Sequence, residues 1–237
     1  MLITTAGTGT YPLLPPYAAD GASRLITDNV FERLAEIGPN LNTGGTEGFV
    51  PELADRWEFA ADSMSIAFHI NPRARWHDGQ PVRASDVRFT FNVLKDPKSA
   101  TAYTAVIGTI DSVSVRDSLT AVAWYNQRTP EQFYDFVYQV YVMPEHILKD
   151  IPHDKLSSSP EANRPIGTGR FRFVSMEPGV RIEIIADTAH YRGGPKLDRV
   201  ITAFAGDANA AITQLLSGQA GFLEGVPPDV LARVGPA

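Results

Sequence analysis

Apolar positions follow helical spacing in three stretches of this chain. From about Ser23, apolar residues recur every three or four positions as far as Gly38-Pro39, which predicts a helix over 23–37. The same spacing predicts further helices over 85–95 and 208–216. The chain is therefore expected to hold a few short amphipathic helices, each with one buried face.

Between the predicted helices, apolar and polar residues alternate. Residues 64–70 keep this alternation throughout, the period of a half-buried strand. Strands mixed with helices and long connections indicate an α/β (mixed α+β) fold. Further strands are predicted over 2–5, 113–115, 120–124, 171–174, 182–185 and 200–204.

Composition narrows the class of protein. The 237 residues are 43% hydrophobic, which is enough for a sizeable core and excludes a disordered chain. The 19 glycines and 18 prolines argue against a plain helical bundle. A formal net charge of −6 argues against a general nucleic-acid partner, because binding to phosphates needs a basic surface.

Catalytic and metal-binding motifs are missing from the sequence. The absence of cysteine excludes disulfide scaffolds, Cys-ligated zinc and thiol catalysis, and the five histidines never form HExxH. Neither GxSxG nor the Walker pattern occurs, so we expect no cofactor, no metal and no enzyme activity. A hydrolase with a pair of carboxylates stays open as an alternative, because such a pair depends on distance in space.

Targeting signals are also missing. No stretch approaches the ~18 apolar residues that span a bilayer. The first five residues lack the basic and apolar regions of a signal peptide. Either the protein stays inside the cell or a signal has been removed from it.

Several short motifs occur in the order found in one family. Trp76–Val82 followed by Ala84–Val87 resembles that family's pattern W-x-D-G-x-P-[FV]-T-A-x-D-V. The chain is thereby identified as similar to the extracytoplasmic solute-binding proteins of ABC importers, in the dipeptide, oligopeptide and nickel-binding group (family 5). Further segments that resemble the family are Pro51–Glu58, Ile66–Ile70, Val142–Ile147, Pro165–Phe171, His190–Asp198, Leu215–Ala220 and Gly225–Asp229.

The resemblance implies a type II periplasmic-binding-protein-like lobe with an inserted β-rich subdomain. Residues 1–42 and 160–237 would form a discontinuous main domain, and residues 43–159 the inserted subdomain. The family's second lobe would lie beyond this chain, which would be an N-terminal portion. We therefore expect weak or no solute binding by the chain alone. Departures from the family pattern occur at Leu14, Arg83, Arg192 and Gly221.

The resemblance also implies a function. The protein would capture a peptide or similar small solute outside the cytoplasm, in the periplasm for example, and deliver it to an ABC permease. A solute sensor on the same fold is an alternative, and the exposed face of the lobe could associate with a second copy. Candidate ligand-binding residues lie in the first loop, after the Asp96-Pro97 turn, and where the chain re-enters the main domain. They are Tyr11, Asp20, Gly21, Tyr103, Gly167, Thr168 and Gly169.

Some of these residues also have a purely structural interpretation. The glycines Gly167 and Gly169 could serve turn geometry or a close backbone approach. Tyr103 could simply pack as a half-buried side chain. Asp78 and Asp86 match the family pattern, but we interpret them as a turn former and a helix-start residue.

Overall fold

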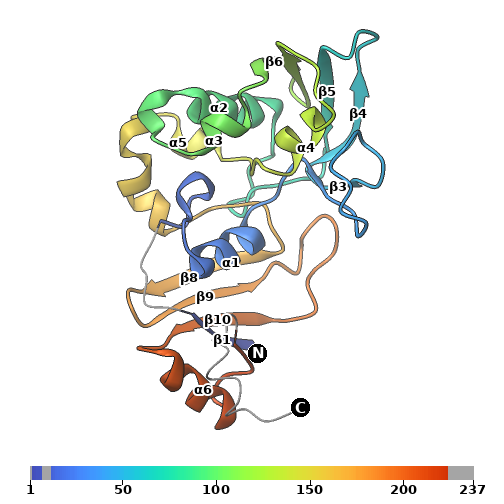
Figure 1. Cartoon of the computed structure of the whole chain (residues 1–237). Coiled ribbons are helices and arrows are strands. Elements are labelled where there is room, and N and C mark those ends of the chain that lie inside the picture. Colours follow the sequence, from blue (N-terminus) through green and yellow to red (C-terminus); the bar gives the residue numbers. More distant parts are fainter. Residues whose placement is uncertain (1, 7–11, 224–237) are drawn as a thin grey trace.

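The described residues form two main sheets, with α1 and most of the other helices on the side of the five-stranded sheet that faces the second sheet (Figure 1). The computed structural model describes residues 2–6 and 12–223. The predicted mixed α/β class is confirmed. None of the helices in these described ranges has the length and apolar character needed to cross a membrane.

The first sheet has five strands in the order β11-β1-β10-β9-β8. β1 pairs in parallel with β10 and β11, whereas β10, β9 and β8 pair antiparallel. The turn that joins β8 to β9 carries Gly179 at a φ of 70°, which favours glycine. The bounds are β1 (Leu2–Ala6), β8 (Phe171–Glu177), β9 (Arg181–Ala186), β10 (Arg199–Phe204) and β11 (Phe222–Leu223).

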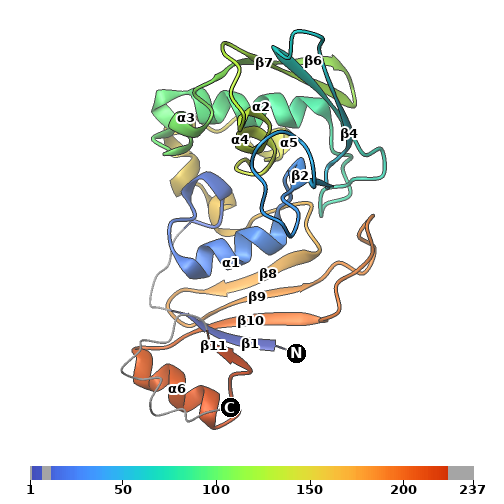
Figure 2. The ribbon, with the colours of Figure 1, turned by 45° about the vertical axis from the view of Figure 1, so that its right-hand side comes forward.

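Helix α1 (Gly21–Val30) lies between this sheet and helices α2 to α5, whereas α6 lies on the other side of the sheet (Figure 2). Its apolar side contributes Ile26 and Val30 to a core shared with the sheet. The predicted helix over 23–37 is too long, because Phe31 is already extended. Apolar spacing continues past the helix because the extended segment crosses between two cores: Phe31 packs in the first and Leu34 in the second.

The second sheet has four antiparallel strands in the order β4-β5-β7-β6. Helix α2 covers it and begins at Ala84, one residue earlier than predicted, with Arg83 as its N-cap. The bounds are β4 (Ala54–Phe59), β5 (Ser65–Ile70), β6 (Ile110–Asp117), β7 (Thr120–Tyr125) and α2 (Ala84–Lys95).

The remaining elements are short. The polar, serine-rich and proline-containing run over 154–165 folds into two 3₁₀ turns. The bounds are β2 (Ala35–Glu36), β3 (Val50–Pro51), α3 (Tyr103–Val106), α4 (Gln132–Val137), α5 (Glu145–Leu148), α6 (Ala208–Leu216), η1 (Pro15–Tyr17), η2 (Pro97–Ser99), η3 (His153–Ser158) and η4 (Pro160–Asn163).

Asp86 ties the start of α2 to two other segments. Its carboxylate accepts hydrogen bonds from the backbone N–H of Arg83 (2.8 Å) and of Glu145 (2.9 Å), and from the Trp76 indole (3.3 Å). Asp86 is buried, and burial raises the pKa of its carboxyl group. Every contact is to a protein donor, which agrees with the structural role interpreted from the sequence.

Three apolar clusters make up the core of the part of the chain that the structure describes. One fills the space between the five-stranded sheet and α1, and a larger one underlies the four-stranded sheet. The third joins Leu14 of the first loop to α2, α5 and the 3₁₀ turns. The predicted division into 1–42 with 160–237, and 43–159, stays a prediction.

Candidate functional site

A cavity of about 440 Å³ lies between α1 and the segments that contain α3 and residues 138–141. Its wall combines aromatic rings with charges of both signs, the composition that binds a small polar solute. Its charged and tyrosine lining residues are Arg24, Asp28, Arg33, Tyr103, Tyr138 and Tyr141.

Arg33 is held in this cavity by two aromatic rings. Its guanidinium carbon lies 4.0 Å from the ring centre of Tyr141 and 4.5 Å from that of Tyr138, which is cation–π geometry. The same guanidinium is 3.2 Å from Glu36 and 3.7 Å from Asp28. Arg33 therefore presents a fixed cationic group.

Asp28 is the acidic partner in the cavity. Its carboxylate accepts a hydrogen bond from the Tyr141 hydroxyl. Burial raises the pKa of Tyr141, so this hydroxyl keeps its proton and remains a donor. The Asp28 side chain is 53% exposed, so it can still meet a cation from solution.

Tyr103, a predicted ligand residue, lines the same cavity from the start of α3. It also packs against the large apolar cluster, so both interpretations of this residue have support. Burial raises the pKa of its hydroxyl, which stays protonated near neutral pH.

The candidates from the first loop, Asp20 and Gly21, lie at the start of α1 rather than in the cavity wall. Asp20 is the N-cap of α1: its carboxylate accepts from the backbone N–H of Ala22 (3.0 Å) and of Ser23 (3.2 Å). Gly21 is the first residue of the helix, with open space where a Cβ would stand. Neither lines the cavity. Tyr11 lies outside the described residues.

The predicted residues Gly167, Thr168 and Gly169 lie against the end of α1. The Gly169 N–H donates to the carbonyl of Val30 (2.8 Å). A Cβ on Gly167 would stand 1.8 Å from that carbonyl oxygen, and one on Gly169 would stand 2.3 Å from the Asn29 oxygen. Close backbone approach, rather than a positive φ, therefore requires glycine here.

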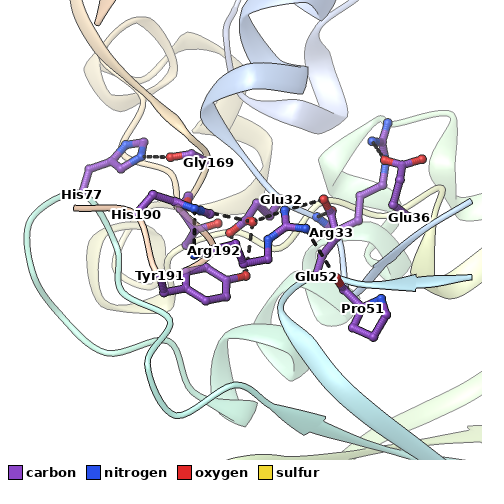
Figure 3. A network of polar contacts seen from close by, with 11 residues as sticks. Glu32, Arg33, Glu36, Pro51, Glu52, His77, Gly169, His190, Tyr191 and Arg192 are labelled. Atoms are coloured by element: carbon purple, nitrogen blue, oxygen red, sulfur yellow. Dashed lines mark hydrogen bonds and ion pairs between the residues drawn. The ribbon is translucent and has the colours of Figure 1, made fainter. Parts of the chain in front are cut away.

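His77 joins this glycine segment to the turn before α2. The Gly167 N–H donates to Nδ1 (3.3 Å), and Nε2 lies 2.9 Å from the Gly169 oxygen (Figure 3). His77 also donates its backbone N–H to the Gly167 carbonyl (2.8 Å). Since Nδ1 accepts, Nε2 must carry the proton, and the ring is neutral in the folded protein.

This contact predicts a pH dependence of stability. Burial lowers the pKa of His77 below its ordinary value of 6.5. The contribution of His77 to the free energy of unfolding is therefore fully present above about pH 6.5. It is lost as the pH falls through the lower pKa of the folded protein, and the free energy of unfolding then falls by up to about 1.4 kcal/mol per pH unit. Urea unfolding between pH 8 and pH 5 should show a flatter profile for His77→Gln than for the wild type.

His153→Gln is the matched control for that experiment, because the His153 ring pairs with Asp96 and packs against Phe89 rather than against the glycine segment. Equal pH slopes for the wild type and His77→Gln would contradict the role assigned to His77.

A buried ion-pair network continues from this segment (Figure 3). One nitrogen of Arg192 lies 2.6 Å from Glu32 and 2.7 Å from Glu52. The Tyr191 hydroxyl donates a hydrogen bond to the Glu32 carboxylate (3.2 Å), and the backbone N–H of Arg33 donates one to the Glu52 carboxylate (3.1 Å). Burial alone would lower the pKa of Arg192, but Glu32 and Glu52 outweigh it and hold that pKa above its ordinary value.

Glu32 and Glu52 are close enough to raise the question of a catalytic carboxylate pair. Burial raises the pKa of Glu52, and the positive charge of Arg192 offsets only part of this rise. Both carboxylates, however, share the Arg192 guanidinium and further protein donors, so their oxygens are committed to internal contacts. This arrangement is a structural ion pair and gives the hydrolase alternative no support. Within the described ranges, no group of three acidic or histidine side chains is placed to hold a metal.

The sequence did not single out several residues of this region. Asp28 and Arg33 both fall within the helix predicted over 23–37, and Tyr138 and Tyr141 end an aromatic-rich run that starts at Phe133. That run was the available signal, since clustered tyrosines often line polar cavities. Glu32 gave no signal, because its partners lie about 160 residues away in sequence.

Comparison with known proteins places the chain in a family. The family model described as "Bacterial extracellular solute-binding proteins, family 5 Middle" matches residues 48–236. A Brucella ovis protein named as an ABC transporter peptide-binding protein is 32% identical over 88% of this chain. The oligopeptide-binding protein AppA of Bacillus subtilis is 28% identical over 87% of it. The chain spans 38% and 37% of the lengths of these two relatives.

Solved structures support the fold. AppA of Bacillus subtilis, determined in complex with a nonapeptide, superposes with a TM-score of 0.85 at 26% identity, over 98% of this chain and 45% of that one. NikZ of Campylobacter jejuni gives a TM-score of 0.79 at 23% identity, over 92% of this chain and 42% of that one, which shows the fold alone. The expected type II binding-protein lobe is thereby confirmed. This chain belongs to the bacterial extracellular solute-binding proteins of family 5.

Proposed function

We propose that this chain is part of the solute-binding component of an ABC importer, with a peptide or similar small solute as its ligand. The cavity between α1 and residues 138–141 carries the proposal. It combines a cation fixed between two rings with an accessible carboxylate. A peptide brings the complementary set: a terminal carboxylate, a terminal ammonium and apolar side chains.

The proposal assigns roles within the cavity. Arg33 and Arg24 would face the carboxylate of the solute, and Asp28 its ammonium group. Tyr103 and Tyr138 would cover apolar parts of the solute with their rings. Family membership and the peptide-binding names of the relatives support this choice of solute class.

The domain division belongs to the same proposal. Residues 1–42 with 160–237 would form the main domain and residues 43–159 the inserted subdomain. The five-stranded sheet takes its strands from the first set and the four-stranded sheet from the second, which supports the division. The cavity would then lie where the two parts meet, and hinge closure in such proteins brings groups from separate parts onto one ligand.

We also propose an extracytoplasmic location and two protein partners. An ABC permease in the membrane would receive the solute, as the family and the names of its members imply. Self-association through an exposed face of the lobe is the second partner proposal. The family's binding role supports a protein without catalytic activity.

Titration of the ¹⁵N-labelled chain with trialanine, followed by NMR, tests the proposal and detects weak binding as well as strong. The peptide should shift the amide signals of Tyr103, Asp28 and Tyr138 in a saturable way. Trialanine with both ends blocked should shift them less, because it lacks both charges. Larger shifts with an uncharged disaccharide than with either peptide would contradict the proposed solute class.

A further inference from the structure

A second cavity, of about 300 Å³, lies beside α5 and shares no lining residue with the cavity described above. Its wall combines the first loop, the residue that follows α1, helix α5 and the 3₁₀ turn η4 with the residues after it. Apart from two charged side chains, every lining residue is apolar. This composition differs from that of the first cavity, where charged and tyrosine side chains predominate.

The apolar wall is rigid and continues the core. Leu14 and Leu148 line the cavity and belong to the third apolar cluster, so an apolar group placed here would extend that cluster. Three prolines, Pro144, Pro160 and Pro165, also line it. Because the proline ring fixes φ, this part of the wall needs little rearrangement to receive a ligand.

The two charged lining residues have opposite signs and lie one turn apart. The backbone N–H of Arg164 donates to the carbonyl of Glu161 (3.2 Å), which closes the turn. Residues three apart in a 3₁₀ turn project to the same side. Nevertheless, neither side chain forms an ion pair or a hydrogen bond within the part of the chain that the structure describes. A carboxylate and a guanidinium group are therefore both available at one apolar cavity.

We propose that this cavity binds a single amino acid with an apolar side chain, such as leucine. The guanidinium group of Arg164 would face the α-carboxylate, and the carboxylate of Glu161 would face the α-ammonium group. The side chain would occupy the apolar part of the cavity. The volume lies at the lower end of the range for small-molecule sites, ~300–1,000 Å³, which suits one amino acid better than a longer peptide. This site is separate from the proposed peptide site and does not depend on it.

NMR observation of methyl signals tests the site directly. L-Leucine should shift the methyl signals of the lining residues Ile147, Leu148 and Ile166 in a saturable way. Glycine should bind at least about tenfold more weakly, because it has no side chain to fill the apolar part. The amide signals of Tyr103 and Tyr138 report on the other cavity in the same titration. Unchanged methyl signals, or equal affinities for leucine and glycine, would overturn the proposal whatever the tyrosine signals do.

The roles of the two charges are tested with 4-methylpentanoate, which is leucine without its ammonium group. Glu161→Gln should weaken leucine binding by up to about fivefold, the effect of one exposed ion pair, and should not weaken 4-methylpentanoate binding. Arg164→Gln should weaken the binding of both. Arg116→Gln, which alters an exposed arginine on β6 outside the cavity, is the matched control and should change neither affinity. If wild-type and both cavity variants bound leucine equally, the assignment of an amino acid to this cavity would be wrong.

Discussion

Gly167→Ala should lower the free energy of unfolding by about 3 kcal/mol, the upper end for overpacking. The added Cβ would stand 1.8 Å from the Val30 carbonyl oxygen, and backbone cannot move aside as a flexible side chain can. The hydrogen bond that the Gly167 N–H donates to His77 and the one between His77 and the Gly169 carbonyl would be strained together. Urea unfolding followed by tryptophan fluorescence measures the loss.

Gly21→Ala is the matched control for this prediction. A Cβ on Gly21 meets nothing within 4 Å, and the residue opens helix α1. Alanine there should be neutral or should stabilise the chain by about 0.5 kcal/mol. If Gly167→Ala cost no more than Gly21→Ala, the close approach of the glycine segment to α1 would be wrong.

Arg192→Met should have an effect of similar size, at about 3 kcal/mol or more, because it leaves buried carboxylates without their counter-charge. Glu32 is 4% exposed and Glu52 is 12% exposed, so solvent cannot replace the guanidinium. Burial already raises the pKa of Glu52, and without the opposing charge of Arg192 that folded-state pKa should rise further. The loss is then smallest below about pH 4.3 and grows as the pH rises through the folded-state pKa of Glu52.

Urea unfolding at pH 4 and at pH 7 tests this prediction. The difference in free energy of unfolding between the wild type and Arg192→Met should be larger at pH 7 than at pH 4. Adding Glu32→Gln to Arg192→Met should recover part of the loss, since it removes one unpaired charge. A double variant no more stable than Arg192→Met would show that the network contributes little.

Much of the fold could be predicted from apolar spacing. The alternation over 64–70 appears as β5, and the strands predicted over 171–174 and 182–185 appear as the paired strands β8 and β9. The first helix shows where spacing fails. Phe31 and Leu34 continue the pattern although the chain is extended, because each enters a different core. Local spacing cannot tell one buried helix face from a segment that crosses between cores.

The candidate site could be predicted only in part. Tyr103 was identified from the resemblance to the family, and it does line the cavity between α1 and residues 138–141. Arg192 was noted only as a departure from the family pattern. Its partners Glu32 and Glu52 lie 160 and 140 residues away in sequence, so only tertiary structure brings the three together.

The most direct test of the central claim, that the cavity between α1 and residues 138–141 contacts solute, compares trialanine binding by three forms of the chain in the NMR titration. Tyr138→Ala should weaken binding by up to about tenfold, the upper end for one aromatic contact. Trp124→Ala removes an exposed aromatic ring on β7, away from the cavity, and should leave the affinity unchanged. Equal affinities for the wild type and both variants would contradict the claim.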